Sequence, residues 1–285
     1  MTENCLIDAH IHVWTSDCAA YPLANGFDVC AMRPSTFTLQ EFLAHASPCG
    51  VRRAVLIQMT HYGFDHSYIL DIIRQYSNRF VGVALIDENA TDLEEILNEL
   101  RAGGIVGLRL VMLNRDANAW VDSRGMQNVL RSAAAQNMAA CFLCDPKALP
   151  AINRVCRQFP ELRVVIDHMA RIGADGDLNV NQIARLCELA THRGLYVKVS
   201  AFYALGSKRP PYLDLLPMIR LLRDAFGAAR LMWGSDCPFQ VAPGHNYRQS
   251  LELLTERADF LSDDERQQFL QGTAEQVFFG RAAKQ

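Results

Sequence analysis

The feature that most constrains the fold is a series of eight short apolar segments spread along the whole chain. They are rich in Val, Ile and Leu, and each is followed by a stretch in which apolar residues recur at helical spacing. Near-continuous apolar segments of this length are typical of parallel β-strands that are covered on both faces. The predicted strands cover residues 5–12, 54–60, 80–86, 104–111, 139–144, 163–168, 195–201 and 230–235.

Eight successive β-then-α units in 285 residues predict an α/β fold, a single (β/α)8 TIM-type barrel that covers residues 1–285. A doubly wound open sheet is the alternative. That fold normally carries a glycine-rich phosphate-binding turn after its first strand, where this chain has His10-Ile11-His12. No linker, low-complexity stretch or charge run divides the chain, so we expect one domain.

Several helix starts can be predicted from a local motif. A Ser or Thr followed three residues later by Glu is typical of a capping box, in which the two side chains bond free backbone N–H groups of the first turn. The motif occurs at Thr38–Glu41, Thr91–Glu94 and Ser262–Glu265. Further helices are predicted near residues 65–76, 123–136, 146–158, 180–193, 211–225 and 246–258, with extra C-terminal helices at about 262–279, the last of them near 273–279.

The charge balance argues against several classes of partner. The formal net charge is −3 and no basic block occurs, so the electrostatic footprint of a nucleic-acid-binding protein is absent. No apolar run approaches the length of about 18 residues that crosses a bilayer, and the start of the chain lacks a signal-peptide pattern. The nine cysteines have no framework spacing and are expected to be reduced thiols. We therefore expect a cytoplasmic protein without a membrane or nucleic-acid partner, and we leave a homo-oligomer open.

Three predicted strands end in side chains that commonly ligate metals. The first carries His10 and His12, which alternation places on one face, while the sixth ends at His168 and the eighth at Asp236. In a (β/α)8 barrel the catalytic groups gather at the carboxyl ends of the strands, so these four side chains are predicted to meet there. Such a set could bind a metal ion or direct several donors at one substrate oxygen. Asp167, which alternation places on the opposite face from His168, is predicted to be structural.

Further polar residues are predicted to line the mouth of the barrel and to contact the substrate. Arg109 and Lys198 are charged residues inside apolar strands, where a position at the mouth is more tolerable than one against the outer helices. A structural salt bridge is the alternative for both. The predicted cations outnumber the carboxylates that can be placed beside them, which favours an anionic small-molecule substrate, in particular a carboxylate. The predicted substrate contacts are Arg109, Arg171, Lys198, Tyr62, Tyr203 and His61.

Three motifs occur in an order and at a spacing that span nearly the whole chain. They are Ile7–His12, Val165–His168 and Leu231–Pro238, accompanied by the weaker motifs Gly107–Leu110 and Val197–Ser200. Together they resemble the amidohydrolase superfamily, specifically its amidohydrolase-2 branch. That branch includes 2-pyrone-4,6-dicarboxylate lactonase and sugar-acid lactonases. The resemblance therefore implies a distorted (β/α)8 barrel and a hydrolase, in particular a lactonase.

The resemblance also implies which residues form the site. The family's His-x-His pair falls on His10 and His12, its strand-6 histidine on His168, and its strand-8 aspartate on Asp236. Members with two metals carry a bridging Lys or Glu on strand 4 and a His on strand 5, and the matching positions of this chain differ: Arg109, Val111 and Cys144. We therefore expect at most one divalent ion, bound by the two histidines of the pair together with His168 and Asp236. Zinc suits this nitrogen-rich set, and metal-free catalysis stays open.

The implied reaction is hydrolysis of a small lactone, with or without one divalent metal. Asp236 takes a proton from water while the three imidazoles, directly or through a metal, polarise the carbonyl oxygen. The neighbouring Cys237 is a weak candidate for a nucleophile that this mechanism does not need. The same motifs are compatible with a metal-dependent decarboxylase or a lactone isomerase of the superfamily, and a non-catalytic barrel that binds a small acid is a remote alternative.

Overall fold

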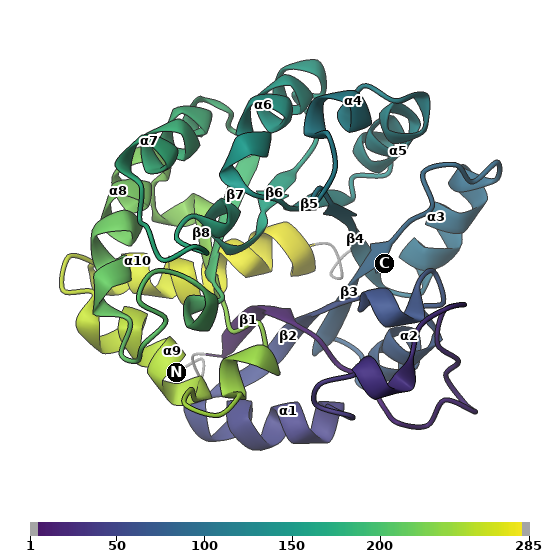
Figure 1. Ribbon diagram of the computed structural model, residues 1–285, viewed down its shortest axis with the longest axis horizontal. Coiled ribbons are helices and arrows are strands. Elements are labelled where there is room, and N and C mark those ends of the chain that lie inside the picture. The colour runs from purple at the N-terminus through teal and green to yellow at the C-terminus, as the bar shows by residue number, and fades with distance from the viewer. Residues whose placement is uncertain (1–4, 281–285) are drawn as a thin grey trace.

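Figure 1 shows the computed structural model, in which eight parallel strands form a ring with helices around it. The structure describes residues 5–280. The strands follow one another around the ring in chain order, and each pairs in parallel with the next. Their bounds are β1 Leu6–Ile11, β2 Val51–Ile57, β3 Phe80–Leu85, β4 Ile105–Val111, β5 Ala139–Leu143, β6 Val164–Ile166, β7 Leu195–Ser200 and β8 Leu231–Gly234.

The ring closes between β8 and β1. The backbone N–H of Asp236 donates to the carbonyl of His10, and that of His12 donates to the carbonyl of Cys237, both at 2.8 Å. Gly234 at the end of β8 allows this close approach, because a Cβ there would lie 2.9 Å from the Cβ of His10. The predicted barrel is confirmed, and the two strands that carry the pair of histidines and Asp236 are joined directly.

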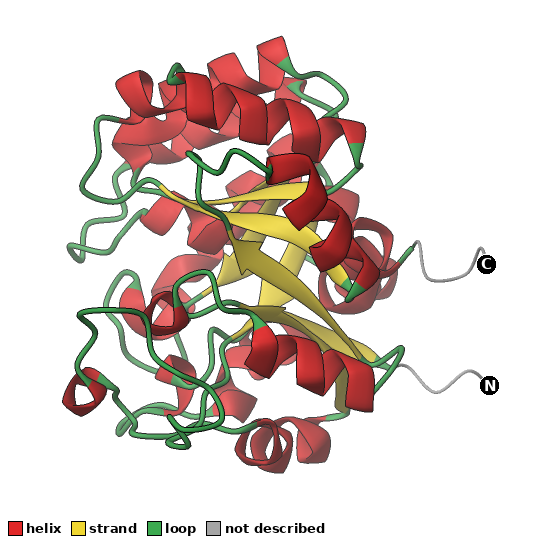
Figure 2. Cartoon of the chain, turned by 90° about the vertical axis from the view of Figure 1, so that its right-hand side faces the viewer, coloured by secondary structure: helices red, strands yellow, loops and turns green. Residues whose placement is uncertain are grey.

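The helices lie outside the ring and enclose the strands (Figure 2). No helix of residues 5–280 is long and apolar enough to cross a membrane. The helix bounds are α1 Leu39–Ala46, α2 Ser67–Gln75, α3 Leu93–Ala102, α4 Ala117–Val121, α5 Arg124–Ala135, α6 Leu149–Gln158, α7 Val180–Glu188, α8 Leu216–Phe226, α9 Tyr247–Glu252 and α10 Asp263–Gln267.

The C-terminal helical segment closes the bottom of the barrel. Arg53 and Arg163, at the amino ends of β2 and β6, bond to this segment through Glu275 and the carbonyl of Val277. In Figure 1 it is the yellow helix that crosses the centre of the ring. Its side chains Ala274, Val277, Phe278 and Phe279 pack in one apolar cluster with the inward residues of the strands, which are Ile7, Ala9, Val55, Ile57, Val83, Ala139, Cys141, Val165, Tyr196 and Met232.

Most of the predicted helices are confirmed, and the exceptions have local causes. Thr38 and Ser262 form the predicted capping boxes. The box predicted at Thr91–Glu94 is wrong, because Asp92 takes the capping position of α3 and its side chain makes no capping bond. The final helix predicted near 273–279 is present, but it is continuous with the preceding one, because the chain stays helical from Asp263 to Phe279 with turns of π type. The short α4, which was not predicted, lies in the loop after β4.

Candidate active site

His10 and His12 face the site because β1 is irregular. Ile7 and Ala9 point into the apolar interior, and the pairing of β1 with β2 shifts register in the second half of the strand. The shift brings His10 to the same inner side as Ala9, and alternation then continues to His12. The Nε2 atoms of the two histidines lie 3.3 Å apart, so the prediction that they share a face is confirmed.

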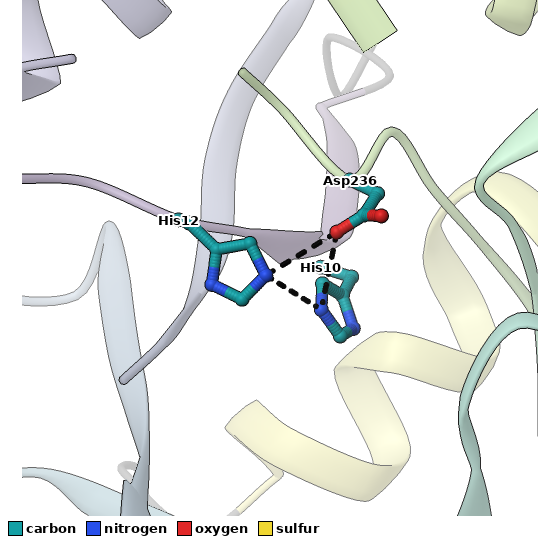
Figure 3. Close-up of side chains that lie close together, drawn as sticks. All are labelled: His10, His12 and Asp236. Atoms are coloured by element: carbon teal, nitrogen blue, oxygen red, sulfur yellow. Dashed lines mark hydrogen bonds and ion pairs between the residues drawn. The ribbon is translucent and has the colours of Figure 1, made fainter. Parts of the chain in front are cut away.

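Asp236 lies against both imidazoles, as Figure 3 shows. Its Oδ1 atom is 3.5 Å from Nε2 of His10 and 3.3 Å from Nε2 of His12. Asp236 follows β8 with a left-handed backbone (φ 65°), which turns the carboxylate back toward β1. All three side chains are buried. Two strands that are neighbours in the ring therefore direct three ligand-type side chains at one point.

This three-residue group could hold a metal ion. One nitrogen from each of His10 and His12 and one oxygen of Asp236 all lie within 4.8 Å of one another. Oδ1 of Asp236 is buried and has no hydrogen-bond partner among the described residues. A buried carboxylate oxygen without a donor, beside two imidazole nitrogens, is what a divalent cation would satisfy. The donor set therefore fits one metal ion.

His168 approaches the other oxygen of the same carboxylate. Its Nε2 lies 3.8 Å from Oδ2 of Asp236, and its ring centroid is 4.4 Å from that of His10. Its Nδ1 bonds to the hydroxyl of Ser200 on β7 at 2.8 Å, which fixes the orientation of the ring. The structure brings this predicted residue to the cluster but places it beside the three-residue metal group.

Tyr203 contacts Asp236 directly. Its hydroxyl donates to Oδ2 of the carboxylate at 2.6 Å. Burial by itself raises the pKa of the Asp236 carboxyl, but the electrostatic interactions with His168, His12 and His10 lower it further than burial raises it, so the net pKa is depressed. Asp236 is therefore ionised at neutral pH and available as a proton acceptor.

Arg109 lies against His12. Its Nη1 is 3.3 Å from both ring nitrogens of His12 and donates to the carbonyl of Gln58 at 3.4 Å, while its Nε is buried without a partner among the described residues. Nδ1 of His12 donates to the carbonyl of Ile57 at 2.8 Å, which leaves Nε2 with its lone pair. Burial and the charge of Arg109 both lower the pKa of His12. His12 is therefore neutral and presents an acceptor to the site.

Lys198 and Asp167 form a buried ion pair beneath His10, which is the structural salt bridge that the sequence left as the alternative for Lys198. Lys198 Nζ is 3.1 Å from Oδ1 of Asp167 and 3.1 Å from Nδ1 of His10, and the lysine side chain is fully buried. Lys198 therefore lies on the floor of the site, and its contact with a substrate stays a prediction. Asp167 faces inward as His168 does, because β6 ends at Ile166 and the left-handed backbone of His168 (φ 53°) interrupts the alternation.

Three further predicted contacts lie apart from the cluster. Arg171 pairs with Asp145 at the rim at 3.0 Å. The hydroxyl of Tyr62 accepts a bond from the backbone of Thr15 at 3.1 Å. The ring of His61 packs edge-on against Trp14, with 5.4 Å between centroids. Burial, with a smaller contribution from the charge of His12, lowers the pKa of His61 to about 4. A substrate contact of Arg171, Tyr62 or His61 therefore stays a prediction.

The predicted surplus of cations at the mouth is therefore wrong. Lys198 is neutralised by Asp167, and Arg171 by Asp145. Arg109 has no carboxylate within ion-pair distance among residues 5–280. Of the three predicted cations, it is therefore the one whose charge is not neutralised by an aspartate. The error has a simple cause, because both neutralising aspartates lie on elements adjacent in space and distant in sequence.

Asp8 is a structural member of the site that the sequence did not single out. It accepts bonds from the backbone of Ser235 (2.8 Å) and His10 (3.1 Å) and from the hydroxyl of Tyr247 (2.8 Å). Burial raises its pKa to about 6. Because these bonds join β1, β8 and α9, Asp8 fixes the closure of the ring where His10 and Asp236 meet. Simple alternation would have placed it beside His10, and the irregularity of β1 places it on the outer side.

The fold and the site together define a hydrolase-type (β/α)8 barrel with a His-His-Asp centre at the carboxyl ends of its strands. The sequence model of the amidohydrolase family matches residues 7–280. The chain therefore belongs to the amidohydrolase family, and the resemblance that the sequence motifs indicated is confirmed.

Relatives of known name agree with this assignment. L-fucono-1,5-lactonase of Burkholderia ambifaria is 30% identical over 274 residues, which cover 94% of this chain and 93% of that protein. A putative 2-pyrone-4,6-dicarboxylic acid hydrolase from Pseudomonas putida has a similar structure, with a TM-score of 0.82, 24% identity, and coverage of 97% of this chain and 98% of that one. An amidohydrolase from Burkholderia multivorans, crystallised with bound zinc, gives a TM-score of 0.82 at 22% identity, covering 96% and 99%.

Proposed function

We propose that this protein hydrolyses the ester bond of a small lactone to give the hydroxy acid. The observation that carries the proposal is the ionised Asp236 carboxylate, whose Oδ1 has no donor and lies beside the Nε2 atoms of His10 and His12. A carboxylate in this position can take a proton from water, and the surrounding donors can stabilise charge on a carbonyl oxygen. The lactonase and hydrolase names of the relatives support the same reaction.

The residues of the site suffice for both steps of the reaction. Water first adds to the carbonyl carbon while Asp236 takes its proton, and the carbonyl oxygen, which becomes negative, receives bonds from Arg109 and from imidazole N–H groups. The ring C–O bond then breaks, and Asp236 returns the proton to the alkoxide that leaves. No protein nucleophile is needed. Burial raises the pKa of the Cys237 thiol well above its usual value, which disfavours a thiolate there.

We propose zinc as the metal that the site would bind. His10, His12 and Asp236 would hold it, with His168 as the proposed fourth ligand, because imidazole and carboxylate donors suit this ion. When bound, zinc supplies a Lewis acid that makes water more acidic and polarises a carbonyl group.

The cavity next to the site favours a lactone of a sugar acid over a lactone with several carboxylates. Arg109 and residues of the loops after β2, β3 and β4 line a cavity of about 400 Å³, a size that suits a small ligand. Arg115, which also lines this cavity, pairs with Glu88 at 3.4 Å. Arg109 is thus the unpaired lining cation, and the mechanism uses it at the carbonyl oxygen, so we expect a substrate with hydroxyl groups and at most one carboxylate.

The test is a panel of neutral sugar lactones and acidic lactones. Acid release is measured in a pH-stat and carbon dioxide in parallel, before and after treatment with a chelator, and the metal content is measured by elemental analysis. We expect one equivalent of acid for each lactone consumed, no carbon dioxide, and higher kcat/KM for the neutral lactones. Carbon dioxide release without ring opening would instead assign the decarboxylase chemistry that the motifs also allow.

We also propose a reduced, cytoplasmic setting for the protein. All nine cysteines are free thiols, including Cys141 and Cys144, which supports this location. Assembly into a homo-oligomer stays a prediction.

A further inference from the structure

The buried Lys198–Asp167 pair gives Nδ1 of His10 two different neighbours, a hydrogen-bonded ammonium group and a carboxylate oxygen slightly farther away. Nδ1 of His10 lies 3.1 Å from the ammonium nitrogen of Lys198 and 3.5 Å from Oδ1 of Asp167. Lysine can only donate, and an ionised aspartate can only accept. The two neighbours therefore select opposite tautomers of the same imidazole.

Each tautomer gives the site a different chemical group. If Lys198 donates to Nδ1, the proton of His10 resides on Nε2, which then acts as an N–H donor toward the site. If Nδ1 carries the proton and donates to Asp167, Nε2 presents a lone pair, the form that binds a metal. The choice between the two forms decides whether His10 donates to a substrate oxygen or ligates a cation.

His12 provides an independent reason to prefer one form. Its Nδ1–H is committed to the carbonyl of Ile57, so its Nε2 carries a lone pair. That atom faces Nε2 of His10 at 3.3 Å. Nε2 of His10 thus faces this lone pair and, at 3.5 Å, the carboxylate oxygen Oδ1 of Asp236, so without a cation between these groups a proton on Nε2 of His10 is favoured. The contact of His10 Nδ1 with Lys198, at 3.1 Å, is shorter than its contact with Asp167, at 3.5 Å, which also favours a proton on Nε2.

We propose that Lys198 and Asp167 are positioning residues that set the tautomer of His10, and that Lys198 favours the Nε2–H form. The bonds then run in one direction, from Lys198 to His10 and from His10 to His12. His12 in turn donates to the carbonyl of Ile57. The inference rests on the proposed function for its catalytic meaning, since the Nε2–H group would donate to the lactone carbonyl. A metal that binds here must displace this proton, so Lys198 opposes metal binding and Asp167 assists it.

The experiment measures the tautomer and the metal affinity separately from activity. Chelator-treated protein labelled with ¹⁵N-histidine is studied by long-range ¹H–¹⁵N correlation, and the His10 signals are assigned by their loss in His10→Gln. Zinc affinity is measured by competition with a chromogenic chelator. The variants are Lys198→Met, Lys198→Gln and Asp167→Asn, each with a thermal unfolding curve. Because Gln keeps an N–H donor and lacks the charge, it separates the hydrogen bond of Lys198 from its electrostatic effect.

We expect the wild type and Lys198→Gln to show protonated Nε2, and Lys198→Met to shift toward protonated Nδ1. Changes in groups that orient a ligand commonly alter metal affinity about tenfold or more. Zinc should accordingly bind about tenfold more tightly to Lys198→Met and about tenfold more weakly to Asp167→Asn, with Lys198→Gln near the wild type.

Three results would overturn the proposal. They are protonated Nδ1 in the wild type, equal behaviour of Lys198→Gln and Lys198→Met, and weaker zinc binding in all three variants. The last would indicate a purely structural pair. If Lys198→Met fails to fold, the wild-type spectrum and the other two variants still decide the question. Failure of the lactone panel would leave these spectra unaffected, so the two proposals can fail separately.

Discussion

Replacing Arg109 with Met tests the role of the one predicted cation that the structure leaves without a carboxylate. Its guanidinium is buried and lies 3.3 Å from both ring nitrogens of His12, where the proposed mechanism places the reacting carbonyl. A hydrogen bond to a charged group contributes about 1.5–3 kcal/mol, and about 1.4 kcal/mol corresponds to tenfold in rate. The variant should lose about ten- to a hundredfold in kcat/KM. Because the group lies at the carbonyl, neutral and acidic lactones should lose equally.

The pH dependence of the same variant should change in a defined direction. Burial and the positive charge of Arg109 together lower the pKa of His12. Without that charge His12 takes up a proton more easily, so its pKa rises and the acid limb of kcat/KM moves to higher pH. The assay is kcat/KM for one neutral and one acidic lactone across about pH 5 to 8, the range in which histidines titrate.

Arg115→Met is the matched control. Arg115 lines the same cavity, pairs with Glu88 and stacks over Trp120 at 4.9 Å, and has no contact with His12. Arg115→Met should leave the acid limb of the kcat/KM profile in place, and the melting temperatures of both variants should show that they are folded. A loss confined to acidic lactones would assign Arg109 to a substrate carboxylate instead. An unchanged kcat/KM with an unshifted limb would refute the reasoning altogether.

Three further predictions follow from the site. Asp236→Asn should lower kcat by orders of magnitude with a much smaller change in KM, and near-normal turnover would show that this carboxylate is not the base. Elemental analysis should find at most about one divalent ion per chain, since a requirement for two would contradict the three-residue metal group. Burial raises the pKa of Asp8 from 3.8 to about 6, which corresponds to about 3 kcal/mol for ionising it in the folded protein. The protonated Asp8 therefore contributes stability that is present below about pH 4 and is lost as the pH rises through about 6. In urea titrations, the difference in unfolding free energy between wild type and Asp8→Asn should therefore change by up to about 3 kcal/mol between about pH 4 and 7, and a constant difference would show that Asp8 keeps an ordinary pKa.

The sequence predicted the barrel well because apolar strand patterns are local, and each strand of the ring is covered on both faces. The strand-end argument also brought His10, His12 and Asp236 to one point, because the carboxyl ends of parallel strands meet at one edge. Side-chain direction was less predictable. The register shift in β1 and the left-handed turn at His168 break the alternation on which the assignment of Asp167 depended.

Charge pairing could not be predicted for a different reason. Whether a lysine or arginine is free depends on partners that lie far away in sequence. Asp167 is about thirty residues from Lys198, and Asp145 lies at the end of another strand from Arg171. Counting cations along the chain therefore overstated the positive charge at the mouth. In the structure, Arg109 is the one of these three cations without a paired aspartate, so the expected substrate is a neutral or singly charged lactone.

The most direct test of the central claim is hydrolysis of a lactone from the panel in H₂¹⁸O, followed by mass spectrometry of the product. If Asp236 activates water for attack on the carbonyl, one ¹⁸O atom should appear in the carboxylate of the hydroxy acid and none in its hydroxyl group. Asp236→Asn should form this product orders of magnitude more slowly. Label in the hydroxyl group, or no ring opening of any lactone by the folded protein, would contradict the account.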